Sequence, residues 1–178
     1  SVRLAAQCTD ARVNMIVPQL FARFPDIRAL ADADVSDIEQ IVRPCGLGKS
    51  KAKDISACMQ MLRDDFDCKV PDNMDDLLKL PGVGRKSANL IMGDVFGQPA
   101  IVTDTHCIRL SNRIGLVDDI KDPRKVEMAL WQIIPPEESN NLCHRFVDHG
   151  RAVCTARTKP HCDRCVLMDI CREASTKQ

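Results

Sequence analysis

Apolar residues recur along this chain at the three- and four-residue spacings of amphipathic helices, and strand-like alternation of apolar and polar residues is missing. A first stripe begins after Asp10 and ends near Pro25. Its apolar members are Val13, Ile16, Val17, Leu20 and Phe21. Short joints with proline or glycine separate such stripes, and they have the composition of turns rather than of interdomain linkers. The pattern therefore predicts an all-α fold.

Further helices are indicated by capping residues and apolar spacing. Ser36 and Glu39 have the spacing of a capping box before an apolar pair. Ser50 begins the next stripe. The remaining stripes predict helices over residues 105–114, 123–134 and 140–149.

A Leu-Pro-Gly-Val-Gly-Arg-Lys sequence begins at Leu80. The proline ends a leucine-rich run, and Gly82 and Gly84 permit a tight turn that a Cβ atom would obstruct. An amphipathic stripe starts again at Arg85, so we expect a helix, a hairpin and a second helix over about residues 77–96. The unpaired N–H groups that open the second helix attract anions such as a nucleic-acid phosphate. From the glycines alone, a corner that only reverses the chain fits equally well.

Two residues near this hairpin have side chains suited to catalysis. Lys86 is expected one turn into the second helix, and Asp104 follows an apolar Ala-Ile-Val segment that brings the chain back. An amine and a carboxylate are the residue types of a nucleophile and its acidic partner. Lys86 and Asp104 are therefore the candidate catalytic residues.

The ten cysteines divide into two groups. Six are scattered, often on apolar faces, where small buried core residues are expected. The other four are Cys154, Cys162, Cys165 and Cys171, separated by seven, two and five residues. Four thiolates in so short a segment suit a tetrahedral zinc ion or an iron–sulfur cluster, although a zinc ribbon normally offers two Cys-x-x-Cys pairs. Two disulfides are the remaining alternative, but nothing in the sequence indicates an oxidising compartment.

The segments Leu80–Asn89 and Val102–His106 resemble the helix-hairpin-helix and aspartate signature of the endonuclease III family, which are base-excision DNA glycosylases. The Ala-Gln-Cys-Thr-Asp segment at residues 6–10 and the cysteine group are similar too, so the resemblance covers almost the whole chain. It implies the helix-hairpin-helix glycosylase fold, with a helical domain over residues 1–114 and a C-terminal helical region with the cysteine loop over residues 115–178. Family members usually carry further helices before residues 6–10, which indicates an incomplete start.

The resemblance also assigns roles to residues. The backbone of Gly82, Val83, Gly84 and Arg85 would hold DNA phosphates. In the family, a leucine inserts into the duplex near the lesion, and a glutamine occupies the gap left by the extruded base. The matching residues here are Leu47 and Gln7. Without the resemblance, Leu47 would be an ordinary loop anchor and Gln7 a helix residue.

At the cysteine group the family holds a [4Fe-4S] cluster, which would make Cys154, Cys162, Cys165 and Cys171 its ligands. The gap after Cys154 is one residue longer than the usual family spacing, which would alter the loop before Cys162. Basic residues near the site would contact DNA phosphates or compensate the charge of the cluster. They are Arg151, Arg157, Lys159 and Arg164.

The activity implied by the resemblance is removal of an oxidised pyrimidine from duplex DNA, followed by a nick 3′ to the abasic site by β-elimination. Lys86 would attack the sugar and form a Schiff base. Adenine-mismatch glycosylases of the same superfamily are the nearest alternative, because they resemble this hairpin and share the aspartate. They usually lack a lysine at this position, so Lys86 favours the first assignment. A non-catalytic DNA-binding module with a structural cluster and an electron-transfer protein are alternatives from other classes.

Charge and composition add a few limits. The 25 basic and 25 acidic residues cancel, so net charge alone does not indicate a polyanion partner, but residues 77–113 hold five basic against two acidic residues. Only 3% of residues are aromatic, which argues against rows of stacking rings for single strands. No run has membrane length and no signal peptide is present. We therefore expect a monomer that binds duplex DNA with a damaged base or abasic site and no membrane. The expected location is cytoplasmic and nucleoid-associated if the source is bacterial, with a nuclear or organellar location left open.

Overall fold

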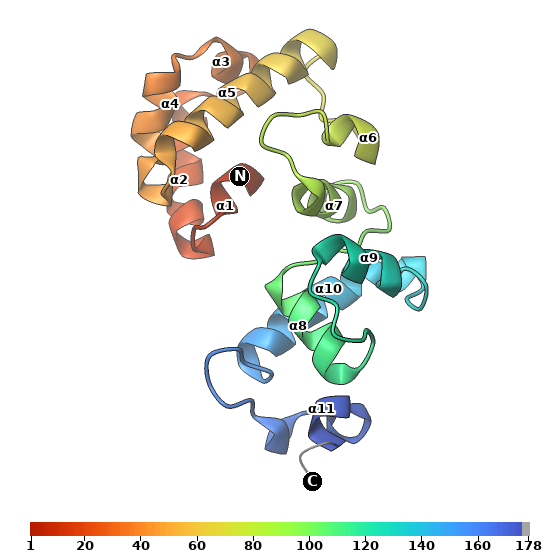
Figure 1. The fold of residues 1–178 in the computed structure, drawn as a ribbon. Helices are drawn as coiled ribbons and strands as arrows, with labels where there is room; N and C mark the ends of the chain where they lie inside the picture. The colour runs from red at the N-terminus through yellow and green to blue at the C-terminus, as the bar shows by residue number, and fades with distance from the viewer. Residues whose placement is uncertain (176–178) are drawn as a thin grey trace. The chain divides into compact units, whose positions relative to one another are not determined.

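The computed structural model describes residues 1–175, and within that range the secondary structure is entirely helical (Figure 1). This confirms the all-α prediction. The chain forms two compact units, one over Ser1–Ala88 and the other from Asn89 onward. The division falls inside one helix, α7 (Arg85–Asp94). The domain boundary expected between residues 114 and 115 stays a prediction.

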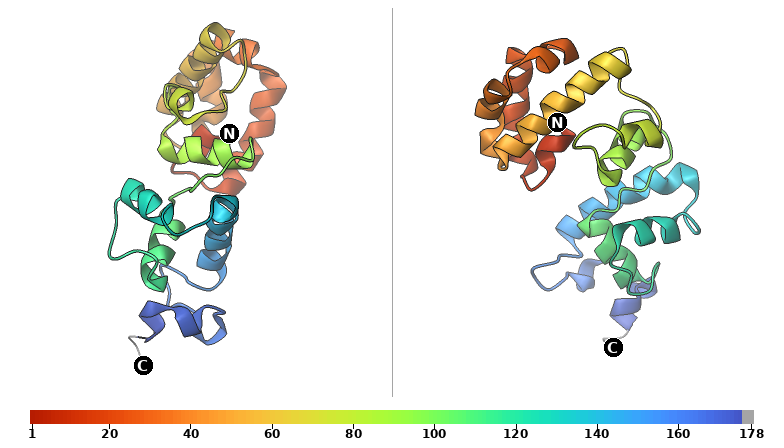
Figure 2. Two further views of the ribbon diagram at one scale, coloured as in Figure 1. Left: turned by 90° about the vertical axis from the view of Figure 1, so that its right-hand side faces the viewer. Right: turned by 45° about the horizontal axis from the view of Figure 1, so that its top comes forward.

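The first unit is built around its longest helix, α5 (Gly48–Asp65). Figure 2 shows α3 and α4 beside α5, and these helices pack against it. The other helices are α1 (Val2–Ala5), α2 (Asp10–Arg23), α3 (Ile27–Asp32), α4 (Val35–Val42), the 3-10 turn η1 (Arg43–Cys45) and α6 (Met74–Leu77). Their apolar stripes meet in one aliphatic core, which includes Leu20, Ile38, Val42 and Ile55. Burial of these side chains is the main favourable term that holds the unit together.

Side-chain caps decide where several helices of this unit begin. Thr9 caps α2, which starts at Asp10 and ends before Pro25 as the stripe predicts. The capping box expected at Ser36 is wrong. Asp34 is the N-cap of α4, and its carboxylate accepts a hydrogen bond from the N–H of Ser36 at 2.7 Å, because an acidic side chain was already in place two residues upstream.

The second unit has its core between α8 and α10. Its helices are α8 (Thr105–Ile114), α9 (Pro123–Leu130), α10 (Pro136–Ala152) and α11 (Arg172–Ser175), with the 3-10 turns η2 (Cys162–Arg164) and η3 (Met168–Ile170). The predicted range of α8 is confirmed, whereas α10 begins earlier than expected. Pro136 supplies that start, since a proline is well tolerated in the first turn of a helix.

Buried residues of the second unit stop before its cysteine loop. Leu110, Val126, Leu130 and Phe146 lie in the core. None of the described residues from 151 to 175 is buried. The part of the chain that the structure describes also contains no helix long and apolar enough to cross a membrane.

Candidate active site and metal centre

The predicted hairpin is present between α6 and α7. Leu77 and Leu80 are buried and anchor its first half, and the N–H of Val83 donates to the carbonyl of Leu80 at 3.1 Å. The second helix opens at Gly84, whose carbonyl accepts from the N–H of Ala88 at 2.9 Å. The hairpin therefore has a packed entrance and an exposed turn, as expected for a segment that presents its backbone to a ligand.

Residues 82 and 84 of the hairpin are glycines for different structural reasons. Gly82 has φ +74°, and a Cβ atom there would lie 2.8 Å from the Cβ of Asp54 and 2.9 Å from the Cδ of Arg3. Both neighbours belong to an ion pair that joins α1 to α5 at 2.6 Å. A Cβ atom at Gly84 would meet nothing within 4 Å. Close packing explains why residue 82 is a glycine. Gly84 instead leaves open space at the exposed turn, where a ligand could approach the backbone closely.

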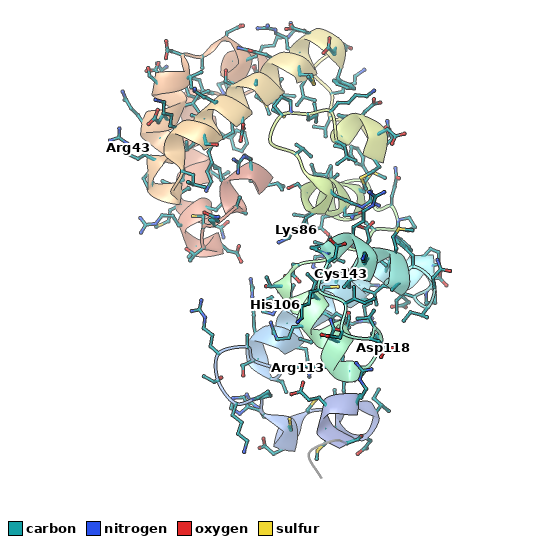
Figure 3. All side chains as sticks on the ribbon, viewed as in Figure 1. Arg43, Lys86, His106, Arg113, Asp118 and Cys143 are labelled. Carbon is teal, nitrogen blue, oxygen red and sulfur yellow. The ribbon has the colours of Figure 1, made fainter. Side chains whose placement is uncertain are left out.

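Lys86 lies in the first turn of α7 with its side chain exposed, as Figure 3 shows. Helical backbone holds its Cα in place. The sequence predicted Lys86 one turn into this helix, whereas it is the second residue of α7.

Asp104 has a structural role that the sequence reasoning missed. It is the N-cap of α8, and its Oδ1 accepts a hydrogen bond from the N–H of Cys107 at 2.7 Å. The side chain is only half-buried. The signal was available in the sequence, because an aspartate directly before a helical stripe is a common N-cap. One carboxylate oxygen is therefore oriented by the helix start.

The segment that leads to Asp104 is tied to α10 by two hydrogen bonds. The N–H of Ala100 donates to the Oγ of Ser139 at 3.1 Å, and the N–H of Val102 donates to the Sγ of Cys143 at 3.2 Å. Ala100, Val102, Ser139 and Cys143 are all buried. Neither Ser139 nor Cys143 was singled out from the sequence, since each acts on a segment about forty residues away in the chain. Lys86 belongs to the first unit and Asp104 to the second.

The structure brings Gln7 and Leu47 into one region of the first unit. Both have left-handed backbone, with φ +52° at each, and both side chains are exposed. A Cβ atom at Gly46 would lie 4.0 Å from the carbonyl oxygen of Gln7, so the two loops are neighbours. Leu47 is 54% exposed, which is far more than a loop anchor would be. Gln7 lies in a turn between α1 and α2 and not in a helix.

The four clustered cysteines line a single hollow in the second unit. Apolar side chains, including Leu110, Ile114 and Leu167, complete its wall. All ten cysteines are free thiols, so the disulfide alternative is wrong for this structure. Among the described residues, no three His, Cys, Asp or Glu side chains converge on one ion position. Four thiols that line one hollow are compatible with a multi-iron cluster, in which each iron takes its own thiolate.

Arg113 and His149 lie beside two of the cysteine sulfurs. Arg113, labelled in Figure 3, donates from Nη1 to the Sγ of Cys154 at 3.3 Å and to the carbonyl of Thr155 at 3.0 Å. The Nε2 of His149 lies 3.5 Å from the Sγ of Cys165. Contacts of this kind orient the sulfurs of metal-binding cysteines.

The lengthened loop between Cys154 and Cys162 is closed by its own threonines. The Oγ1 of Thr155 donates to the carbonyl of Thr158 at 3.1 Å, and the N–H of His161 reaches the carbonyl of Val153 at 3.0 Å. The extra residue is thereby absorbed inside the loop. Of the basic residues singled out here, Arg157 and Lys159 are exposed, while Arg164 donates to the carbonyl of Ala152 at 2.8 Å.

Comparisons with known proteins decide the family. Residues 1–136 match the model of the HhH-GPD superfamily base excision DNA repair protein, and residues 154–171 match the iron-sulfur binding domain of endonuclease III. The endonuclease III of Synechocystis sp. is 45% identical over 172 residues, which cover 96% of this chain and 78% of that protein. The chain belongs to the endonuclease III family.

Other members give the same result. The endonuclease III of Bacillus subtilis is 37% identical over 177 residues, covering 99% of this chain and 80% of that protein. Two solved structures, a non-covalent endonuclease III–DNA complex and a trapped endonuclease III–DNA covalent intermediate, each match with a TM-score of 0.91 and 40% identity, covering 99% of this chain and 82% of theirs. As a member of this family, the chain is a DNA glycosylase and lyase of base excision repair that binds DNA and carries an iron–sulfur cluster.

Proposed function

We propose that this chain removes oxidised pyrimidines from duplex DNA and then nicks the strand 3′ to the abasic site by β-elimination, with Lys86 as the nucleophile. The observation that carries the proposal is the exposed Lys86 amine in the first helical turn after a Gly-Val-Gly hairpin. The proposed partner is a duplex with one damaged base or abasic site, bound by a monomer. The proposed location is the bacterial cytoplasm at the nucleoid, since the relatives compared are bacterial.

Recognition begins with extrusion of the damaged base, because its sugar carbon is not accessible inside the stack. The exposed turn formed by Gly82, Val83, Gly84 and Arg85 holds phosphates of the damaged strand through its backbone. Leu47 enters the duplex as an apolar wedge and offsets lost stacking. The side-chain amide of Gln7 can both donate hydrogen bonds to the orphaned base and accept them from it.

Chemistry follows at the sugar. The neutral amine of Lys86 attacks C1′, a C–N bond forms, and the bond from C1′ to the base breaks with its electron pair leaving on the base. Ring opening yields a Schiff base, after which loss of a proton from C2′ expels the 3′ phosphate. Asp104 either accepts a proton from the amine or stabilises positive charge on the sugar. Its Oδ1 is held by the Cys107 N–H, so the carboxylate keeps one orientation in either role.

Cys154, Cys162, Cys165 and Cys171 are the proposed ligands of a [4Fe-4S] cluster, supported by their shared hollow. Bound there, the cluster supplies cross-links between segments that lack a buried core. Arg113 hydrogen-bonds the sulfur of Cys154, and His149 lies beside the sulfur of Cys165, so both would orient ligands of the cluster. No redox step is part of the proposed reaction.

Borohydride trapping tests the proposal. The protein is mixed with a duplex that contains one oxidised thymine, and the covalent adduct is compared between the unchanged chain and Lys86→Ala. We expect a reduced adduct that is lost in Lys86→Ala while duplex affinity stays within about fivefold, because one exposed cation contributes at most about 1 kcal/mol to phosphate binding. Tight duplex binding with no adduct in the unchanged chain would instead indicate a non-catalytic binding module.

Asp104→Asn separates chemistry from helix capping. Asparagine caps helices as well as aspartate does, so stability should change little. Base release should slow by about 10²- to 10⁴-fold, the usual contribution of acid–base catalysis. The checks are single-turnover kinetics and a thermal melt on the same preparation. An unchanged rate would remove Asp104 from the proposed mechanism.

A further inference from the structure

A lysine is fully buried in the first unit, and the proposed chemistry does not use it. Lys51, in the first turns of α5, is 0% exposed. Its Nζ donates to the carbonyl of Leu4 at 2.9 Å and to the carbonyl of Cys45 at 2.7 Å. A buried amine is costly unless its hydrogen bonds are made, so these two contacts account for its place in the core.

The two carbonyls belong to the segments that carry Gln7 and Leu47. Leu4 lies in α1, three residues before Gln7, and Cys45 lies in η1, two residues before Leu47. The backbone N–H of Lys51 also donates to the carbonyl of Leu47 at 2.9 Å. One residue thus contacts the Leu47 segment through backbone and side chain and the Gln7 segment through its side chain.

Both segments need such support because of their backbone conformation. A left-handed residue with a side chain costs roughly 1–2 kcal/mol, and Gln7 and Leu47 both have φ +52°. Such conformations persist where the surroundings hold them, and they gather at functional sites. Lys51 itself is held rigidly, since its neighbours Ala52 and Ile55 are part of the core.

We propose that Lys51 is a positioning residue that sets the separation between Gln7 and Leu47, so that both enter the duplex together at a damaged base. The inference rests on the proposed function, in which these two side chains fill the gap. Lys51 touches no DNA. It acts through the two carbonyls, which hold the loops at one spacing before DNA arrives.

The test uses Lys51→Met, which keeps the length of the side chain and removes its donors. The probe is a duplex with one tetrahydrofuran abasic analogue and 2-aminopurine opposite it, whose fluorescence rises when that base is unstacked. We expect the preference for this duplex over an undamaged one to fall about tenfold, equivalent to losing one charged hydrogen bond. The fluorescence rise should shrink, while affinity for undamaged duplex changes less than about twofold, because phosphate contacts dominate that binding.

Two controls separate positioning from a general loss of stability. Leu62→Ala removes a buried side chain about 16 Å further along α5 and should lower the melting temperature without changing the fluorescence response. Lys51→Arg retains donors and should recover part of the response. If Lys51→Met keeps the full preference and fluorescence rise, or Leu62→Ala loses them equally, the inference is wrong.

Failure of the inference is distinguishable from failure of the proposed function. The fluorescence assay needs binding alone, because the abasic analogue cannot form a Schiff base. Trapping on the oxidised-thymine duplex tests the chemistry separately. A trapped adduct in the unchanged chain with no effect of Lys51→Met on either readout would leave the proposed function standing and overturn the role of Lys51.

Discussion

The loops of the first unit and the cysteine loop of the second are held in opposite ways. In the first unit, Gln7 and Leu47 sit on a continuous aliphatic core, and buried Lys51 bonds the segments that carry them. In the second unit, no described residue from 151 to 175 is buried. Its last helix is attached by Arg172, which donates to the carbonyls of Asn112 at 2.9 Å and Val117 at 3.0 Å.

The difference shows what a cofactor contributes to folding. Ordering one residue costs about 1–2 kcal/mol of backbone entropy, and burial of apolar side chains normally offsets it. The first unit has that burial. The segment from Cys154 to Cys171 does not, so we expect its order to depend on the proposed iron–sulfur cluster and on a few hydrogen bonds to α8.

The largest expected effect comes from Cys162→Ser. A serine hydroxyl does not ionise near neutral pH, so the substitution should remove one cluster ligand. We expect loss of bound iron and fast amide hydrogen exchange over residues 154–175, with protection in α2, α4 and α5 unchanged. Iron analysis and hydrogen-exchange mass spectrometry on the protein as purified provide the check.

The matched control is Cys68→Ser, a partly exposed cysteine of the first unit. It should leave both iron content and exchange unchanged. If Cys162→Ser retained full iron and slow exchange in the tail, the contrast between the two units would fail, because the tail would then hold its order without that ligand.

A second prediction compares the hairpin glycines within the first unit. Gly82→Ala places a Cβ atom 2.8 Å from Asp54 in a backbone with φ +74°, and it should destabilise the chain by about 1–3 kcal/mol. Gly84→Ala has open space, so stability should change by less than about 0.5 kcal/mol. The affinity of the Gly84→Ala variant for duplex DNA should fall instead, because the added methyl group would lie where we propose that a phosphate approaches. Urea unfolding and a filter-binding titration would show whether stability and affinity separate in this way.

The smallest expected effect concerns the surface before the hairpin. Hydrogen bonds from Lys79 and Asn73 lower the pKa of Asp76, whose carboxylate lies in α6. An aspartate with a lowered folded-state pKa stabilises the fold above its unfolded value of about 3.9, and that contribution is lost as pH falls through the folded pKa. Asp76→Asn should therefore reduce stability slightly at neutral pH and weaken its dependence on pH below about 4. Urea midpoints measured from pH 3 to pH 7 test this, and a parallel shift at every pH would contradict it.

Local patterns in the sequence were enough to predict most of the longer helices, the hairpin and the cysteine group, although α9 ends at Leu130 rather than residue 134 and α5 begins at Gly48 rather than Ser50. The stripe after Asp10 and the helix from Thr105 to Ile114 appear where the spacing places them. The spacing of Ser36 and Glu39 predicted the wrong start for α4, because Asp34, two residues before Ser36, is the residue that caps the helix. The roles assigned to Lys86, Gln7 and the cysteines came from the resemblance and stay predictions.

The sequence by itself determined which segments become helices and which residue types gather at the hairpin and in the cysteine loop. Periodicity, capping and ligand spacing relate residues a few positions apart, so they can be recognised in the sequence alone. Tertiary structure decided that Lys51 is buried and bonds to Leu4, a residue 47 positions away, and that Ser139 and Cys143 hold the segment before Asp104. Such pairings depend on how the apolar faces of distant helices pack, and packing brings together groups that no local pattern relates.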